Sequence, residues 1–404
     1  MFDPTLLRSR FPALERRVGG SPAVYLDGPG GTQVPDSVIE AMAGFLSRGG
    51  SNLHGPFVTS RETDEVLEGA RAAVADLFGA SPTEVAFGQN MTSLTYAVSR
   101  AIARTWGRGD NIVLTRLDHD ANVTPWVQAA TDTGVEVRFV DFDPDRGCTL
   151  DLGSLDAVLD GRTRLVAFSH ASNAVGTITP VNDIVERAHA VGALTYVDAV
   201  HFAPHGRIDV RASGTDFLVA SAYKWFGPHT GCLYGRRELL ESIEPYKLRP
   251  SPETAPDRWE TGTQSFESLV AVSAAVDYLA SLGSGASRAE RLDDAYRSIL
   301  EHETALSDRF LAGLSEMDHV RLFGLSESHG RTPTFAIDIE GRIPADVAAT
   351  LGSEGIFVWA GDYYAVEVMA RLDHTEHGLV RIGFVHYTTI DEVDRTLNAL
   401  DRLK

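Results

Sequence analysis

The sequence predicts an α/β protein, with a large domain built on a doubly wound, mostly parallel β-sheet and a smaller α+β domain after it. First, residues 20–235 alternate short runs rich in Val, Ile, Leu, Phe and Tyr with helical patterns, which is typical of parallel strands joined by helices. Second, these apolar runs are nearly continuous, as in strands buried on both faces. Third, the chain after residue 268 carries long helical patterns and only short strand-like runs.

Seven segments of the first region are predicted strands, because each is a short apolar run bounded by polar or turn residues. They cover residues 84–88, 111–117, 135–141, 164–170, 194–200, 216–221 and 232–235. Helical patterns between them include residues 63–79 and 181–192. The first pattern ends on Gly79, which suits the left-handed position that closes a helix. This order of strands and helices predicts a sheet covered by helices on both faces.

The second region has a different organisation. One long helical stretch begins at residues 268–283 and continues through 288–316. Short strands at 334–341 and 379–387 precede a final amphipathic helix over 389–403. We therefore expect three parts, which are an N-terminal segment that packs with the small domain (1–18), a large domain (19–284) and a small C-terminal domain (285–404).

Charge and composition exclude several classes of protein. The chain has 404 residues and a formal net charge of −20, from 36 basic and 56 acidic residues. Nucleic acids and anionic membranes need clustered Lys and Arg, so neither is an expected partner. No apolar run is long enough to span a bilayer, and the first residues are too charged for a signal peptide. Two cysteines are too few for a disulfide framework, so we expect a reducing compartment and a cytoplasmic protein. The expected partner is a small molecule.

Residues that are mostly polar gather where the predicted strands end, which is where ligands bind in open α/β sheets. They are Asn90, Met91, Thr92 and Ser93; Asp118 and His119; Asn173; Asp198 and His201; and Ser221, Tyr223 and Lys224. Lys224 stands in the stretch SAYKWFGPHTGCLYG, which contains no acidic residue to pair with it. A lysine in apolar surroundings tends to become neutral, and a neutral amine forms Schiff bases with carbonyl cofactors. Alternatively, its ammonium reaches water past the end of the strand.

Three of these residues meet the chemical needs of pyridoxal phosphate. Lys224 supplies the amine for its aldehyde, and a carboxylate at Asp198 would keep the pyridine nitrogen protonated so that the ring accepts electrons. His119 offers a flat face to the ring. Taken singly, Asp198 could equally be a helix cap and His119 a surface or core histidine, so the prediction rests on the combination.

Other strand-end residues fit the oxygen atoms of this cofactor. Met91 and Thr92 belong to a helical pattern whose N-terminus suits a phosphate. Asn173 and His201 are placed to contact the phenolic oxygen. The glycine-rich residues 27–33 lack the third glycine of a dinucleotide fingerprint, and the sequence has no Walker lysine, H-E-x-x-H or C-x-x-C motif. We predict no metal site.

Matching stretches nearly from end to end of the chain carry a resemblance to a known family: VYLDGPGGTQVPDSVIEAM, FGQNMTSLTYAV, LDHDANVTPW, FSHASNAVGTITPV, YVDAVHFAPH, ASAYKWFGPHTGCLYG, WETGTQ and VRIGFVHYTTIDEVDRTLNAL. The chain resembles the class V aminotransferase group of fold-type I pyridoxal phosphate enzymes, and specifically its cysteine desulfurase-like branch. The resemblance implies the fold of aspartate aminotransferase, pyridoxal phosphate held by Lys224, and a homodimer with active sites at its interface.

The resemblance also implies roles for further positions. Ser221 and Tyr223, just before the lysine, would hold the phosphate, where the family usually has serine and histidine. Thr263 would reach the phosphate of the neighbouring subunit. Arg381 would bind the α-carboxylate of an amino-acid substrate, because a guanidinium fork suits a carboxylate; the alternative is a surface charge at a strand edge. Gly30 is assigned to the substrate side of the site.

One departure from the family bears on the reaction. Desulfurases carry a catalytic cysteine on a loop of the small domain, and in the matching residues 357–369 Tyr364 takes its place. Without a thiolate the loop has no acceptor for a persulfide, and we expect Tyr364 to border the substrate instead. Cys148 falls in a turn and Cys232 in the strand behind the lysine, so neither is expected to replace the missing thiol.

These observations predict a pyridoxal phosphate-dependent enzyme that acts at the α-carbon of an amino acid. Lys224, released from the cofactor, would take the α-proton, and His119 and Asp198 complete the catalytic set. The favoured outcome is β-elimination from cysteine or a cysteine S-conjugate without persulfide formation. A class V aminotransferase, an amino-acid epimerase, a cysteine desulfurase that uses a partner's thiol, and a non-catalytic protein of the same fold are the alternatives.

Overall fold

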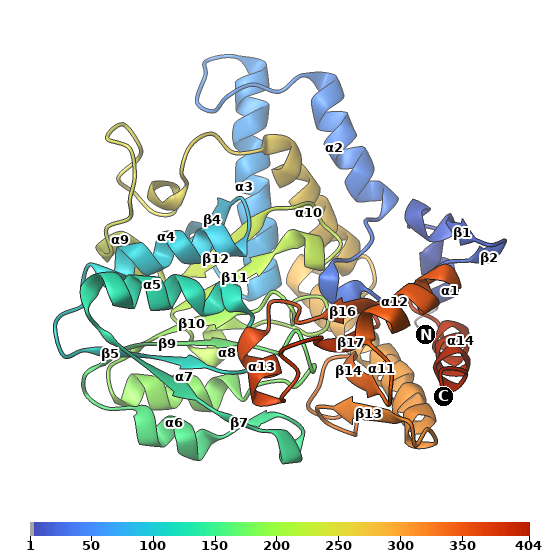
Figure 1. Cartoon of the computed structure of the whole chain (residues 1–404). Coiled ribbons are helices and arrows are strands. Elements are labelled where there is room, and N and C mark those ends of the chain that lie inside the picture. The colour runs from blue at the N-terminus through green and yellow to red at the C-terminus, as the bar shows by residue number, and fades with distance from the viewer. Residues whose placement is uncertain (1–3) are drawn as a thin grey trace.

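A seven-stranded sheet forms the centre of the structure, a computed structural model that describes residues 4–404 (Figure 1). Residues 1–3 of the predicted N-terminal segment lie outside the described residues. The strand order is β4 (Val85–Gly88), β12 (Gly231–Gly235), β11 (Phe217–Ser221), β10 (Leu194–Asp198), β9 (Thr163–Ser169), β5 (Asn111–Thr115) and β6 (Glu136–Val140). Strand β12 runs antiparallel to both neighbours and the other strands run parallel to one another. The predicted α/β fold with a mostly parallel sheet is confirmed, and each predicted strand of the first region is part of it.

Side chains along each strand alternate between two cores, as a doubly wound sheet requires. On β9, Leu165 and Ala167 lie in one core, whereas Val166 and Phe168 lie in the other. Helices of the first face are α4 (Met91–Ala103), α5 (Thr124–Thr133) and α9 (Arg237–Ser242). Helices of the second face are α2 (Asp36–Arg48), α3 (Val58–Phe78), α6 (Leu152–Val158), α7 (Val181–Ala190), α8 (Val210–Ser213) and α10 (Phe266–Ala280). Helix α3 ends at Gly79 with φ at 68°, as predicted.

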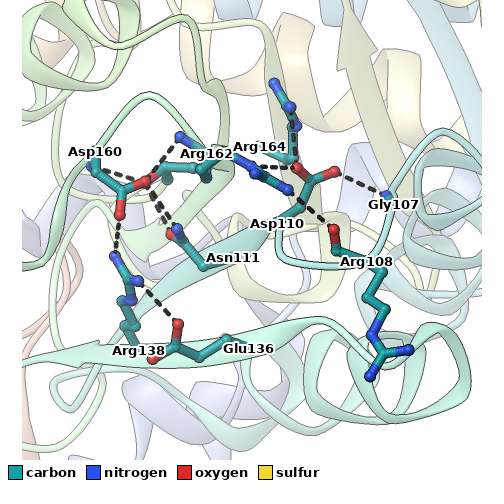
Figure 2. Close-up of polar contacts among 10 residues, drawn as sticks. Gly107, Arg108, Asp110, Asn111, Glu136, Arg138, Asp160, Arg162 and Arg164 are labelled. Carbon is teal, nitrogen blue, oxygen red and sulfur yellow. Dashed lines mark hydrogen bonds and ion pairs between the residues drawn. The ribbon is translucent and has the colours of Figure 1, made fainter.

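Ion pairs connect the amino-terminal ends of three strands, at the edge of the sheet opposite to the predicted site (Figure 2). Asp110, directly before β5, lies 2.9 Å from Nη2 of Arg164 and 3.3 Å from Nε of Arg162. Arg138 on β6 lies 2.7 Å from Asp160, which precedes β9. Because ligands bind at the carboxyl edge of such sheets, we assign this network to stability.

The second region contains two helices where one long helical stretch was expected. Helix α10 ends at Ala280, and α11 covers Arg288–Ser315. The chain turns tightly between them at Gly283. Its backbone lies so close to α11 that a Cβ there would be only 2.2 Å from the carbonyl oxygen of Arg291. A four-stranded antiparallel sheet follows, in the order β13 (Val320–Phe323), β14 (Thr334–Ile339), β17 (Leu379–Gly383) and β16 (Trp359–Gly361). Its helices are α12 (Pro344–Ser353), α13 (Val366–Arg371) and α14 (Ile390–Asp401).

The first and last helices of the described chain lie side by side (Figure 1). Helix α1 (Pro4–Arg8) contacts α14 through an ion pair of 3.0 Å between Arg8 and Glu392. Short strands complete the fold, namely β1 (Arg17–Val18) with β2 (Ser21–Pro22), β3 (Val24–Tyr25) with β15 (Ile356–Phe357), and β7 (Phe142–Asp143) with β8 (Thr149–Leu150). Val24 and Leu26 pack in the core formed by α11, α12 and α14. The division of the chain at residues 18 and 284 stays a prediction.

A separate core joins the two regions. Leu117 and Val175 from loops of the large sheet pack with Phe323, Val368 and Leu379 of the second region. This contact brings β17 and the loop before α13 against the carboxyl edge of the seven-stranded sheet. Within residues 4–404, no helix is long and apolar enough to cross a bilayer.

Candidate active site

A cavity of about 410 Å³ opens at the carboxyl edge of the seven-stranded sheet, within the range of roughly 300–1,000 Å³ typical of small-molecule sites. Its lining consists of Gly30, Asn90, Met91, Thr92, His119, Ser169, Ala171, Asn173, Asp198, Val200, His201, Ser221, Tyr223, Lys224 and His229. The predicted site residues belong to it except Ser93, Asp118, Thr263, Tyr364 and Arg381. Thr263 is exposed, and its contact with a neighbouring subunit stays a prediction, as does the homodimer.

Lys224 lies at the end of a short helical turn, Ala222–Lys224, that follows β11. Its ammonium donates to the Pro29 carbonyl, and Nζ lies 5.1 Å from the centroid of the Tyr223 ring. Burial lowers the pKa of Lys224 to about 7, and the positive charge of Arg381 acts in the same direction. A substantial fraction of the amine is therefore neutral at pH 7, as a nucleophile or a proton acceptor requires.

Asp198 ends β10 and faces the same cavity. The backbone N–H of Val200 donates to Oδ1 at 2.9 Å. Burial raises the pKa of Asp198 to about 6, whereas the hydrogen bond from Val200 and the charge of Lys224 lower it. A buried carboxylate in this position favours a cation beside it, such as a protonated ring nitrogen.

A second buried carboxyl group, Asp118, supports the wall of the cavity. Its Oδ1 accepts hydrogen bonds from Ser169, at 2.8 Å, and from Asn122, at 2.7 Å. Burial raises the pKa of Asp118 to about 7, and the nearby charge of Asp198 acts in the same direction. Asp118 does not line the cavity itself, but its hydrogen bond holds Ser169, which does.

His119 presents a neutral imidazole. Its Nδ1 accepts from the backbone N–H of Ala121 at 3.0 Å, which fixes the ring. Burial lowers the pKa of His119 to about 4, and the charge of Lys224 acts in the same direction. The ring of Tyr364 stacks on it, with centroids 5.4 Å apart and planes at 22°. A flat, uncharged and fixed ring suits stacking against an aromatic ligand.

The N-terminus of α4 forms another part of the lining. Asn90 caps this helix, because its Oδ1 accepts from the backbone N–H of Ser93 at 2.9 Å. The backbone N–H of Met91 donates to Oγ of Ser221 at 3.0 Å, which connects the helix to the end of β11. Thr92 adds a hydroxyl at the first turn, where backbone N–H groups have no partner within a helix and attract anions.

Ser169 and His229 are polar lining residues that the sequence did not assign to the site, whereas Asn90 was among the predicted strand-end residues. His229 stacks on Tyr223, with ring centroids 4.6 Å apart and planes at 8°. Nothing in the local sequence indicates that His229 returns to the cavity after the turn that follows the lysine.

Asn173 and His201 lie together but differ in how they are held. Nδ2 of Asn173 donates to the Tyr363 carbonyl at 2.9 Å, while its Oδ1 is buried with no partner among residues 4–404. Nε2 of His201 lies 3.1 Å from the hydroxyls of both Thr332 and Thr334. The acceptor of Asn173 is therefore open to a ligand, whereas the His201 ring is fixed from the second region.

Arg381 on β17 lies directly behind Asn173. Its Nη1 donates to the Asn173 carbonyl at 2.9 Å, and its guanidinium carbon lies 4.3 Å from the centroid of the Tyr363 ring. The side chain is buried, so the alternative of a surface charge at a strand edge is wrong. Burial lowers the pKa of Arg381 to about 10, which leaves it charged at neutral pH, and its Nε has no partner in the part of the chain that is described.

The loop where the resemblance places the family's cysteine has an unusual backbone. Tyr363 and Tyr364 both adopt left-handed conformations, with φ at 55° and 57°, which costs about 1–2 kcal/mol for each non-glycine residue. The Asp120 N–H donates to the Tyr364 carbonyl at 2.7 Å and holds the loop over the sheet edge. Trp359 packs on Gly30, where a Cβ would lie 2.6 Å from Nε1, so only glycine fits. Strain of this kind concentrates at functional sites.

The family description "Aminotransferase class-V" matches residues 24–396. The chain belongs to this family. A cysteine desulfurase from an Enterobacter species is 32% identical over 422 residues, which cover 100% of this chain and 98% of the relative. The apo structure of the cysteine desulfurase from Thermococcus onnurineus NA1 has a TM-score of 0.87 and 28% identity, and the match covers 98% of each chain. The Escherichia coli cysteine desulfurase CsdA, in an S-sulfonic acid form, has a TM-score of 0.86 and 27% identity over 100% of this chain and 98% of that one.

Class V aminotransferases depend on pyridoxal phosphate. The predictions that this chain has the fold-type I architecture and is a cysteine desulfurase-like enzyme of this family are confirmed. The assignments of Lys224 to the cofactor and of Tyr364 to the place of the family's cysteine stay predictions.

Proposed function

We propose that this chain is a pyridoxal phosphate-dependent C–S lyase that eliminates a thiol from cysteine or a cysteine S-conjugate. The observation that carries the proposal is a half-buried lysine, Lys224, with a pKa of about 7 in a cavity that neither cysteine of the chain lines. Burial raises the pKa of Cys148 to about 11 and that of Cys232 further still, so both are poor sulfur acceptors.

The residues of the cavity fit the cofactor. Asp198 would hold the protonated ring nitrogen, and His119 would stack on the ring. The Oδ1 atom of Asn173, which is buried without a partner, would pair with the phenolic hydroxyl. The start of α4 with Ser221 and Tyr223 would hold the phosphate. When bound, pyridoxal phosphate supplies an aldehyde for the substrate's amino group and a ring that accepts an electron pair.

The chain's own residues account for the proton and the substrate. The neutral amine of Lys224 takes the α-proton, which a pKa near 7 permits at neutral pH. Arg381, charged and with a free Nε, attracts the α-carboxylate toward Asn173. The C–S bond breaks with its electron pair on sulfur, and the thiolate receives a proton. One water then hydrolyses the remaining three-carbon fragment, so the products are a thiol, pyruvate and ammonium.

The phenol of Tyr364 argues against transfer of the substrate's sulfur to the enzyme. It stacks on His119 and is 69% exposed, at the position where the resemblance places the desulfurase cysteine. A phenol oxygen does not accept a sulfane sulfur as a thiolate does. Sulfur from the substrate therefore leaves as a free thiol.

The test combines cofactor attachment with product analysis. Borohydride treatment of the holoenzyme should bleach its visible absorbance and leave the reduced cofactor on the peptide that contains Lys224. The Lys224→Ala variant should lack this label, whereas Lys404→Ala, which removes an exposed lysine, should keep it. With S-ethyl-L-cysteine, the wild-type enzyme should release ethanethiol and pyruvate in equal amounts. Label on another lysine, or no pyruvate from either S-ethyl-L-cysteine or L-cysteine, would contradict the proposal.

A second candidate function is a cysteine desulfurase that uses a partner's thiol. The exposure of Tyr364 favours it, because a partner protein could reach the loop where the resemblance places the family's cysteine. This function predicts alanine from L-cysteine only when a thiol-bearing partner protein is added. Pyruvate formation that is independent of any partner would exclude it.

A further inference from the structure

A second cavity, of about 390 Å³, lies beside the candidate active site and shares no lining residue with it. Helix α11 forms one wall with Tyr296, Leu300 and Glu303. The segment after β10 forms another wall with Phe202 and His205. Most of this surface is apolar, so the cavity suits a compact ligand with an apolar body.

Glu303 places an unused acceptor in this apolar surface. The side chain is only 2% exposed, and its Oε2 lies 2.9 Å from Nδ1 of His205. Its Oε1 is buried and has no partner among residues 4–404. Buried carboxylate oxygens are nearly always hydrogen-bonded to protein, water or ligand, so this atom can accept from a donor inside the cavity.

Of the three arginines in the lining, two have acidic partners, and one of these is Arg297, which lies 2.7 Å from Asp294. Arg207 lies 2.6 Å from Asp293. Arg331 is buried and donates to the carbonyls of Leu325 and Thr334, without an acidic partner in the described chain. Its uncompensated positive charge disfavours a cationic ligand, and Glu303 disfavours an anionic one. A neutral donor is the chemistry that remains.

A pair of histidines in contact with each other lies between the two cavities. The ring of His205 meets that of His201 edge to face, with centroids 5.5 Å apart. His201 lines the candidate active site, and its Nε2 contacts Thr332, which lines the second cavity. Only the rings of His205 and His201 would therefore separate a ligand bound to Glu303 from the predicted cofactor site.

We propose that this cavity is a second binding site, which takes a small neutral molecule with a ring-sized apolar body and one hydroxyl or N–H donor directed at Oε1 of Glu303. The proposal goes beyond the lyase function and does not depend on it. Phenol is the simplest molecule of this class, and toluene matches it in shape without the donor.

The holoenzyme tests the proposal by calorimetric titration with phenol and with toluene. A hydrogen bond to a buried carboxylate should make phenol bind at least about tenfold more tightly than toluene. The Glu303→Leu variant should lose this preference. Leu300, which is 57% exposed and lines the cavity, offers a second variant, because Leu300→Trp fills the space without touching the His205–Glu303 pair. It should abolish phenol binding, while Leu248→Trp, at an exposed site that lines neither cavity, should not.

Crystals soaked with 4-bromophenol locate the ligand through the anomalous signal of bromine. We expect the bromine inside the cavity and the hydroxyl within hydrogen-bond distance of Glu303. Equal affinities for phenol and toluene, phenol binding that survives Leu300→Trp, or a cavity that holds only water on Oε1 would each overturn the proposal.

Discussion

Lys224 should destabilise the cofactor-free protein at neutral pH, because its ammonium is buried. The perturbation is Lys224→Met, which keeps the length of the side chain and removes the charge. The folded-state pKa of Lys224 is about 7, against 10.5 for an unperturbed lysine. Between these two values the unfolded chain binds more protons than the folded one, so the free energy of unfolding of the wild type rises with pH.

The size of the effect follows from the pKa difference. Each pKa unit corresponds to about 1.36 kcal/mol, so the buried charge lowers the free energy of unfolding by about 4 kcal/mol at pH 7 and about 2 kcal/mol at pH 9. Loss of the hydrogen bond to the Pro29 carbonyl offsets about 1 kcal/mol of this in the variant. Lys224→Met should therefore be more stable than the wild type by about 3 kcal/mol at pH 7 and by about 1 kcal/mol at pH 9.

Urea unfolding of the cofactor-free proteins at the two pH values measures this difference. Lys404→Met is the control, because Lys404 is 66% exposed and its loss should change the free energy of unfolding by no more than about 0.5 kcal/mol. A variant no more stable than the wild type at pH 7, or a difference that is the same at pH 9, would refute the reasoning that Lys224 is a largely neutral amine in the folded state.

Three further predictions concern single residues. Asp198→Asn should lower the rate of thiol release by about 100-fold, because an amide does not hold the ring proton, and a coupled assay of the thiol measures it. His119→Ala should raise the dissociation constant of the cofactor by about 2–10-fold through loss of ring stacking, as measured by fluorescence titration. Asp110→Asn should lower the free energy of unfolding by about 1 kcal/mol at pH 7, because Arg162 and Arg164 are partly exposed. The pKa of Asp110 is about 2 in the folded state, below its unfolded value, so this deficit should disappear as the pH falls from about 4 to 2, which acid-dependent urea unfolding follows.

Each of these predictions has a contradicting outcome. Thiol release unchanged in Asp198→Asn would remove that carboxylate from the chemistry. Equal cofactor affinity in His119→Ala would mean that the ring does not stack on the cofactor. A stability deficit of Asp110→Asn that persists at pH 2 would come from packing and not from the ion pairs in Figure 2.

The seven strands of the large sheet were predictable because burial on both faces leaves nearly continuous apolar runs. Leu165 and Phe168, for example, face different cores, and neither face of β9 could accept a polar side chain without a partner. The strand ends were predictable for the same reason. Each run stops where polar side chains such as Asp198 begin the cavity, so the candidate site emerged together with the sheet.

Other features depend on contacts between distant parts of the chain. The break between α10 and α11 arises where Gly283 approaches Arg291, and helical periodicity on both sides conceals it. Arg381 was expected at the substrate, yet its position behind Asn173 is set by the packing of two sheets. The stack of Tyr364 on His119 needs two consecutive left-handed residues, for which the side-chain pattern gives no indication.

The central claim is that the enzyme uses Lys224 to cleave the C–S bond of its substrate and has no thiol that accepts the sulfur. The most direct measurement is the ratio of pyruvate to alanine that the holoenzyme forms from L-cysteine, without added thiols or partner proteins. Pyruvate and sulfide in equal amounts, with no alanine, are the expected result. Alanine as the main product would contradict the account, because sulfur would then be transferred by an enzyme that has Tyr364 in the place of the cysteine.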